Sequence, residues 1–294
     1  MDLLTLWFWP LVALVLLPAL LVYFGLHVVG RGIIFVDLAL AQIAALGIAT
    51  AILFGADPDH GHLPHVLATA FTLAGAALFS LTRFRHARVP QEAIIGVLYI
   101  VAAAASTLVL SRTAAGDEEI KNLLVGNLLL VSREAVLSTL VLFAAVGAFH
   151  FVLRRKFHLV SFDELEAERQ GMSVRLWDFL FYATFGLVVT SFVRLAGVYL
   201  VFSYLIVPAV CGALLSSRIA TRLAIGWGVA LAAGLSGLLL STQWESMDLP
   251  TGPTIVCIFG LLLAGSGAIA WIRHLREAAS SRSDRPGEAG STHI

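Results

Sequence analysis

The sequence predicts an all-α, polytopic integral membrane protein with about nine transmembrane helices, and composition is the first reason. Of the 294 residues, 59% are hydrophobic and only 13% are charged. Soluble domains have about 45–50% apolar and about 25% charged residues. A soluble domain of this length could not bury so much apolar surface, so lipid must be the solvent of this protein. The net charge is zero, which gives no electrostatic basis for binding nucleic acid.

The second reason is a series of apolar segments, each close to the roughly 20 residues that a membrane span needs. They are 7–29, 33–54, 65–82, 93–111, 134–153, 176–193, 196–215, 222–241 and 254–272. Basic residues begin only at Arg31, after the first segment, which favours a retained span over a cleaved signal peptide. We therefore expect one transmembrane domain over residues 1–272. Residues 273–294, rich in Ser, Arg, Glu and Gly, are expected to form a disordered cytoplasmic tail.

The third reason is the distribution of Lys and Arg among the predicted loops. With nine spans and an outer N-terminus, fifteen of the 19 Lys and Arg residues fall on the inner side. Cytoplasmic loops carry such an excess. The bias predicts a multi-pass protein of the inner membrane, with its N-terminus outside and its C-terminus in the cytoplasm.

Two segments depart from the pattern of spans and short loops. Residues 121–131 are apolar but too short to cross, so we expect a re-entrant or interfacial segment on the outer side. Residues 156–174 form the longest inner connection and contain the helix-forming stretch DELEAER. Ser161 or Asp163 could cap the start of a short amphipathic helix there, and Gly171 could end it.

That short helix is acidic although the inner surface around it is basic. A helix lying on anionic lipid would be expected to be basic. Acidity instead favours a protein partner with a groove for Phe162 and Leu165. The alternative is a solvated linker. The acidic side chains of residues 162–171 are Asp163, Glu164, Glu166 and Glu168.

The first predicted outer loop holds a group of possible metal ligands. His60, His62 and His65 lie in ADPDHGHLPH, beside Asp57 and Asp59. Imidazole and carboxylate together suit zinc or manganese. The alternative is a polar loop that is rich in histidine, because the spacing matches no closed structural site.

Ionisable residues near the spans are further candidates for metal binding. Asp37 lies early in the second span, and Gln42 is the next polar residue of that segment. A charge within a span usually faces a pore or a partner, although Asp37 could simply be solvated at the inner interface near Arg31. Glu92 follows Pro90 at the start of the fourth span, where the helix dipole alone would stabilise a carboxylate.

The seventh span contains Ser203, Tyr204 and Pro208. Proline frees a backbone carbonyl and permits a kink, and broken helices often line transport pathways. Ordinary packing explains the three residues equally well.

Other motifs of catalysis are missing from the sequence. It has no Ser-His-Asp order, no phosphate-binding loop and no H-E-x-x-H motif. We interpret the isolated histidines near predicted membrane edges as interfacial residues: they are His27, His150, His158 and His274.

Five segments, taken together and in order, resemble the permease subunits of the zinc, manganese and iron ABC importers. They are QEAIIGVLY, EEIKNLLVGNLLLV, SFDELEAERQGMSVRLWDFL, RLAGVYLVFSYLIVPAVCGALLSSR and DLPTGPTIV. The fourth segment carries Gly197, Leu200 and Pro208, which match the family's pore-region helix. The similarity covers the chain to about residue 272.

One departure from the family lies in the second span. Typical members carry Asp and His four residues apart there, in a D-A-L-S-H pattern, so that both face one side of the helix. This sequence reads D-L-A-L-A-Q. If Gln42 takes the His place, Leu38 takes the Asp place and Asp37 is rotated by about 100°. If Asp37 takes the Asp place, Ala41 takes the His place. The pair is broken either way.

The resemblance implies a permease that works as a homodimer, with a separate cytoplasmic ATP-binding subunit and an outer solute-binding protein. Residues 162–171 would be the coupling helix that the ATPase moves. Divalent metal would be the cargo, with no cofactor bound and no covalent chemistry. One alternative is an ion-driven secondary carrier, which would need coupling groups near the midplane. Another is an intramembrane metalloenzyme at the His60 cluster, which would need a helical metal motif.

Overall fold

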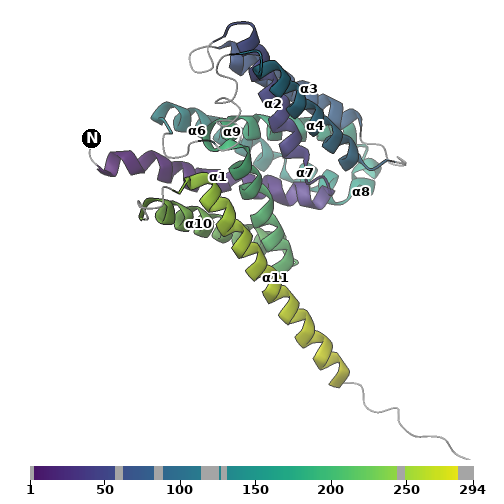
Figure 1. Ribbon diagram of the computed structural model, residues 1–294. Helices are drawn as coiled ribbons and strands as arrows, with labels where there is room; N and C mark the ends of the chain where they lie inside the picture. The colour runs from purple at the N-terminus through teal and green to yellow at the C-terminus, as the bar shows by residue number, and fades with distance from the viewer. Residues whose placement is uncertain are drawn as a thin grey trace, which may run out of the picture.

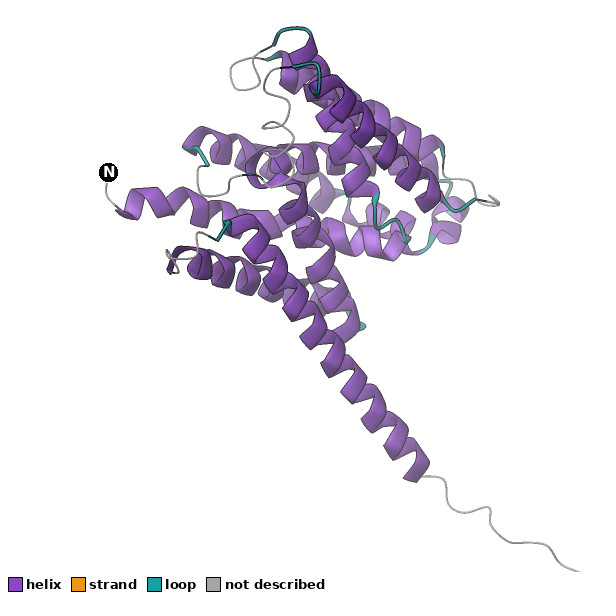
Figure 2. Ribbon diagram, in the orientation of Figure 1, coloured by secondary structure: helices purple, strands orange, loops and turns teal. Residues whose placement is uncertain are grey.

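The described residues form helices joined by loops and turns, and Figure 2 shows no strand among them. The computed structural model describes residues 3–56, 62–82, 89–113, 126, 131–243 and 249–283. Within them, nine helical segments are long and apolar enough to cross a membrane, which confirms the predicted fold class. The helices are α1 (Leu3–Arg31), α2 (Val36–Leu53), α3 (Leu63–Leu81), α4 (Gln91–Leu110), α6 (Arg133–Val152), α7 (Arg154–Phe162), α8 (Glu164–Arg169), α9 (Val174–Leu215), α10 (Ile219–Gln243) and α11 (Thr251–Ser283).

The long helix α9 is the centre of the arrangement (Figure 1). It packs against α1, α2, α3, α10 and α11, while α2 packs between α3 and α4. Small residues allow the close approaches, as is usual where lipid supplies no hydrophobic drive between helices. A Cβ added at Gly47 would lie 2.7 Å from the Leu67 carbonyl oxygen of α3. One added at Gly212 would lie 2.6 Å from the Arg222 carbonyl oxygen of α10.

The sixth and seventh predicted spans follow each other within α9 without a loop. The sequence predicted spans at 176–193 and 196–215, and the structure has two, Val174–Val193 and Leu195–Leu215, which meet at a break in the helical backbone at Gly197. No turn-forming polar cluster separates the two spans, so the change of direction falls on a single residue. Gly197 has φ 77° and ψ 160°, a conformation that is essentially restricted to glycine. Gly197 is the non-helical residue inside α9, and Pro208 lies within the helix that follows it.

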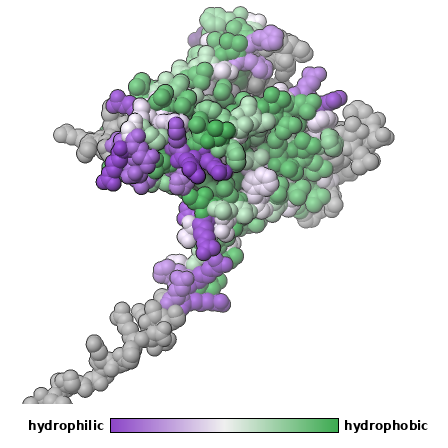
Figure 3. Space-filling model, turned by 180° about the vertical axis from the view of Figure 1, so that it is seen from behind, coloured by the Kyte–Doolittle hydropathy of each residue, from purple (hydrophilic) through white to green (hydrophobic). Residues whose placement is uncertain are grey.

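The last helix extends beyond the predicted end of the membrane domain. The sequence placed a disordered tail from residue 273, whereas α11 continues to Ser283. The stretch WIRHLREAA is rich in good helix formers, which explains the extension. Figure 1 shows this end projecting from the body of the molecule, and Figure 3 shows polar residues along it beside a largely apolar body. Residues 284–294 lie outside the described chain.

The predictions for the two segments that depart from the pattern of spans, 121–131 and 156–174, can be compared with the structure to different extents. The connection 156–174 contains the predicted short helix, which is α8, and a second helix, α7, comes before it. The two are separated at Asp163, which has a non-helical φ of −147° and ψ of 73°. The predicted re-entrant segment 121–131 falls outside the described residues except for Gly126 and Val131. Gly126 has φ 64°, and a Cβ there would collide with the backbone of Ala196 and Gly197 at the α9 kink.

The kink makes the first prediction. Gly197→Ala should lower the stability of the purified protein by about 1–3 kcal/mol, because alanine must adopt a strained φ/ψ pair. Gly260→Ala is the matched control, since Gly260 is helical and its Cβ would meet open space. Thermal midpoints in detergent measure the difference. Equal midpoints for the two variants would show that the kink does not require glycine.

Candidate functional site

A cavity of about 690 Å³ lies between α2, α4, α9 and α11, just after the α9 kink. Its wall is largely apolar, but several neutral groups with oxygen, nitrogen or sulfur face it. These groups belong to Gln42, Tyr99, Ser106, Thr107, Tyr199, Ser203 and Cys257. None of the residues that line it is charged. The cavity therefore offers dipoles and hydroxyl oxygens to a bound species, with no fixed charge.

Helix α2 presents one face to this cavity. Leu38, Gln42 and Ala45 line it, at the spacing of i, i+4 and i+7. Asp37 is not among the lining residues; its side chain is buried, with 2% exposed. Its Oδ1 atom has no hydrogen-bond partner among the described residues. In the D-L-A-L-A-Q stretch, Leu38 and Gln42 therefore lie on the cavity face, and Asp37 points away from it.

The serine and threonine hydroxyl groups in the wall are oriented as acceptors. Ser106 Oγ donates to the Ala102 carbonyl at 2.8 Å, and Ser203 Oγ donates to the Tyr199 carbonyl at 2.9 Å. Thr107 makes the same kind of bond, at 3.0 Å. Because each hydroxyl proton is engaged with the helix backbone, the remaining lone pairs are free to accept from a ligand. The wall is therefore suited to a ligand that presents hydrogen-bond donors.

Only one of the three residues predicted to line a pathway faces this cavity. Ser203 does so, whereas Tyr204 and Pro208 face other helices. The Tyr204 ring packs edge-on against Phe259 of α11, with centroids 4.9 Å apart. Pro208 packs against α10, where a Cβ on Gly226 would lie 3.1 Å from the Pro208 carbonyl oxygen.

The remaining candidate metal ligands do not converge. Glu92 Oε1 accepts a hydrogen bond from the Ile34 backbone N–H at 3.0 Å, so this carboxylate ties the start of α4 to the turn before α2. His62 and His65 are exposed at the start of α3. His60 lies outside the described residues. Within the described part of the chain, no three His, Cys, Asp or Glu residues come together as a metal site.

A buried polar network joins α1, α7 and α9 at the opposite end of α1 from the N-terminus. Arg31 Nη1 contacts Asp178 Oδ1 at 2.7 Å, and both side chains are almost completely buried. Arg31 Nε donates to Ser161 Oγ at 2.9 Å, and His27 Nδ1 lies 2.8 Å from the same oxygen. The guanidinium also lies over the Phe181 ring, 3.9 Å from its centroid. The ion pair is therefore enclosed by hydrogen bonds and an aromatic face, which offset part of the cost of its removal from water. Arg31 Nη2 is buried with no hydrogen-bond partner among the described residues.

Comparison with known proteins identifies the architecture. The sequence profile described as the ABC 3 transport family matches residues 4–269. The chain belongs to this family. It is a membrane permease, a transport subunit and not an enzyme, and the resemblance to the permeases of metal-ion ABC transport systems is confirmed.

The individual relatives have low sequence identity to this chain but align with most of its length. The manganese transport system membrane protein MntC of Halalkalibacterium halodurans is 23% identical over 240 residues, which cover 82% of this chain and 79% of that protein. The protein of the same name from Listeria innocua is 23% identical, over 74% of this chain and 75% of its own. The structure of PsaBC from Streptococcus pneumoniae in complex with Fab aligns with a TM-score of 0.72. It has 20% identity and covers 88% of this chain and 89% of that one.

The network of the permease corrects the interpretation of two histidines. His27 and His150 were expected at the membrane interface, but only 5% and 2% of their surfaces are exposed. His150 lies between the Tyr23 hydroxyl, 3.2 Å away, and the Thr184 hydroxyl, 2.8 Å away. The partners are far apart in sequence, so no local pattern could have revealed them. His158 and His274 are exposed.

Helix α8 of the permease has the two caps that the sequence predicted. Asp163 Oδ1 accepts from the Glu166 backbone N–H at 3.1 Å. At the other end, Gly171 has φ 75°, its N–H donates to the Glu168 carbonyl, and the Met172 N–H donates to the Ala167 carbonyl. This pair of bonds is the Schellman arrangement. The caps hold a helix of only six residues that would otherwise be marginal.

The two apolar residues of this segment have different surroundings. The Phe162 ring packs against Gly30 of α1, where even a Cβ would clash with it, and it lies 5.5 Å from the His27 ring. Leu165, on α8, has 60% of its surface exposed. Phe162 therefore attaches the segment to the membrane domain while 39% of its surface stays exposed, and Leu165 is the more exposed of the two apolar groups.

The buried ion pair makes the second prediction. Asp178→Asn leaves the Arg31 guanidinium uncompensated and should cost about 3–5 kcal/mol of stability, the usual penalty for breaking a buried pair. Arg169→Gln is the control, because Arg169 is exposed and lies 3.7 Å from Glu166 in a surface pair; it should cost about 1 kcal/mol or less. Thermal midpoints in detergent compare them. A loss no larger in Asp178→Asn than in the control would refute the structural role of the pair.

Proposed function

We propose that this permease carries divalent metal ions such as manganese, zinc or iron inward across the inner membrane, through the cavity between α2, α4, α9 and α11. The observation that carries the proposal is the acceptor-lined wall of that cavity beside the Gly197 kink. Family membership and the manganese systems of the relatives support the choice of cargo.

The chemistry of the wall favours an ion that keeps its water. Manganese is suited to carboxylate, carbonyl and water ligands, and Gln42 is the one amide that the cavity offers it. Six waters at about 30 Å³ each occupy about 180 Å³, well within the cavity. Metal-bound waters point their protons outward, toward the free lone pairs of Ser106, Thr107 and Ser203. Weak outer contacts of this kind allow an ion to enter and to leave, as a transport path requires.

The membership of an ABC transport family implies a separate ATPase and a binding protein as partners. We further propose that two copies of the permease form the path. The exposed faces of α4 and α11 flank the cavity, and residues such as Val97, Leu108 and Leu261 have 60–73% of their surface exposed. A second copy would cover these apolar side chains and close the cavity. With the N-terminus outside and α7 and α8 inside, the ATPase would meet the permease at α8.

The ATPase would act through α8 and the buried network. Leu165 and the acids of α8 are presented outward on a short helix that is capped at both ends. Its neighbour α7 holds Ser161, which hydrogen-bonds to both Arg31 and His27 of α1. Displacement of α8 on ATP binding would therefore be transmitted to α1 and, through Asp178, to α9, which forms one wall of the cavity.

The cavity makes the third prediction. Gln42→Leu should lower metal uptake at least tenfold without changing the amount of permease, because the amide is replaced by an apolar group of similar size. Ser203→Ala should lower uptake severalfold. Its matched control is Ser236→Ala, which also removes a hydroxyl bonded to the carbonyl four residues before it, on an exposed face of α10. Uptake of radioactive manganese, zinc and iron measures the effect. Wild-type rates in both cavity variants would exclude this cavity as the path.

The coupling segment makes the fourth prediction. Leu165→Arg should release the ATPase from the permease, since it places a charge where an apolar contact is expected. Leu53→Arg is the matched control at the end of α2, where the leucine is 49% exposed. Co-purification of the ATPase with tagged permease, together with ATP turnover, measures the result. Full co-purification and transport by Leu165→Arg would show that α8 is not the docking element.

A further inference from the structure

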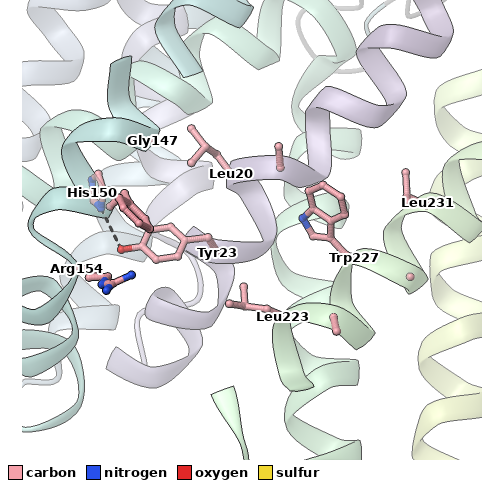
Figure 4. A pocket seen from close by; sticks show the side chains of 12 residues that line it. Leu20, Tyr23, Gly147, His150, Arg154, Leu223, Trp227 and Leu231 are labelled. Atoms are coloured by element: carbon pink, nitrogen blue, oxygen red, sulfur yellow. Dashed lines mark hydrogen bonds between the residues drawn. The ribbon is translucent and has the colours of Figure 1, made fainter. Parts of the chain in front are cut away.

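A long furrow follows α1 on the side away from the transport cavity. Helices α6 and α10 both pack against α1 and leave its surface uncovered between them. Three hollows of about 590, 720 and 440 Å³ line up there. The first two share Ala19 and Trp227, and the last two share Tyr23, Arg154 and Leu223, so the hollows are continuous. Figure 4 shows the middle one.

The furrow is long enough to cross the hydrocarbon of both leaflets. It runs along α1 from Phe8 to His27, and 19 residues of helix rise about 28 Å. This is close to the roughly 30 Å of bilayer hydrocarbon, so the half of the furrow next to α7 has the length of one leaflet. The floor is deepened where side chains are missing: a Cβ on Gly228 would meet nothing within 4 Å, and one on Gly147 only Leu20 at 3.7 Å. An extended acyl chain has the shape and polarity of this space.

The furrow is lined mainly by apolar residues and becomes basic at one end. Its outer and middle parts are walled by residues such as Leu11, Val15 and Leu140. The end next to α7 is walled by Arg154, Arg155 and His158, all of them exposed. None of the residues lining the three hollows is acidic. In Figure 4, Arg154 lies beside Tyr23 and His150 at one side of the hollow, and Trp227 stands at the other.

We propose that this furrow is a binding site for an anionic phospholipid of the inner leaflet. The phosphate is held by Arg154 and Arg155, and an acyl chain lies along α1 between α6 and α10. Guanidinium groups bind phosphate through paired hydrogen bonds, and basic pockets at the cytoplasmic ends of spans select anionic headgroups. The apolar length and the cationic end together have the pattern of one lipid molecule.

A second copy of the chain fits this furrow less well. In a two-fold interface the same surface meets itself. The furrows of both copies would then come together, which brings Arg154 and Arg155 of both copies into one interface with no acid in the furrow to compensate them. An anionic lipid supplies the missing negative charge. Arg154 is the first residue of α7. The bound headgroup would therefore stabilise the junction between α6 and the short helices α7 and α8.

The first test concerns the headgroup. Delipidated permease in detergent is mixed with phosphatidylglycerol or phosphatidylcholine, and retained lipid is counted by native mass spectrometry. Wild type should retain phosphatidylglycerol at least fivefold better than phosphatidylcholine. Arg154→Gln with Arg155→Gln should remove that preference. Arg175→Gln with Arg276→Gln changes the charge equally at two exposed inner positions outside the furrow and should keep it.

The second test concerns the acyl chain and uses an independent variant. Gly228→Phe fills the furrow and should lower the retention of both lipids, whereas Gly265→Phe, also in open space but on α11, should not. A wild type without preference for phosphatidylglycerol would overturn the proposal, and so would an Arg154→Gln, Arg155→Gln variant that behaves like its control. Conversion of dimers to monomers by Gly228→Phe, with lipid retention unchanged, would assign the furrow to a second copy.

Discussion

The buried ion pair between Arg31 and Asp178 is the constraint on which the half of the molecule around α7 and α8 depends. Neither charge could remain in an apolar interior without the other, so the last turn of α1 and the second turn of α9 are fixed against each other. Ser161 adds α7 to the same point through its bonds to Arg31 and His27. Three helices that are far apart in sequence are thereby held in one register, with the Phe181 ring covering the guanidinium.

Helix α9 connects this anchored end to the cavity between α2, α4, α9 and α11. Asp178 lies before the kink and Ser203 after it, so Gly197 separates a fixed half from a half that lines the cavity. A kink set by one glycine permits a change of direction without a loop, whose unpaired backbone would be unfavourable in lipid. The contact of Gly126 with the Ala196–Gly197 backbone adds a second segment to this position.

Sequence alone predicted the features that depend on local pattern. Apolar length and charge bias gave the nine spans, and Asp163 and Gly171 were recognised as caps because capping is chosen by the residue itself. The network was missed because Tyr23 and His150 are 127 residues apart, and His27 and Ser161 are 134. Which of Asp37 and Gln42 faces the cavity depends on how α2 is rotated against α4 and α9. That rotation is set by tertiary packing and is not encoded in the spacing of one helix.

The extension of α11 has a consequence for assembly on the inner side. A helix of 33 residues is about 50 Å long, against roughly 30 Å of hydrocarbon. With the proposed orientation, residues 273–283 stand in the cytoplasm as a stiff rod of about 15 Å. A subunit that docks on α8 must fit beside this rod, and two copies of the permease would place two such rods around it. The rods would limit the angles from which a cytoplasmic subunit can approach, so shape restricts the choice of partner before any contact is made.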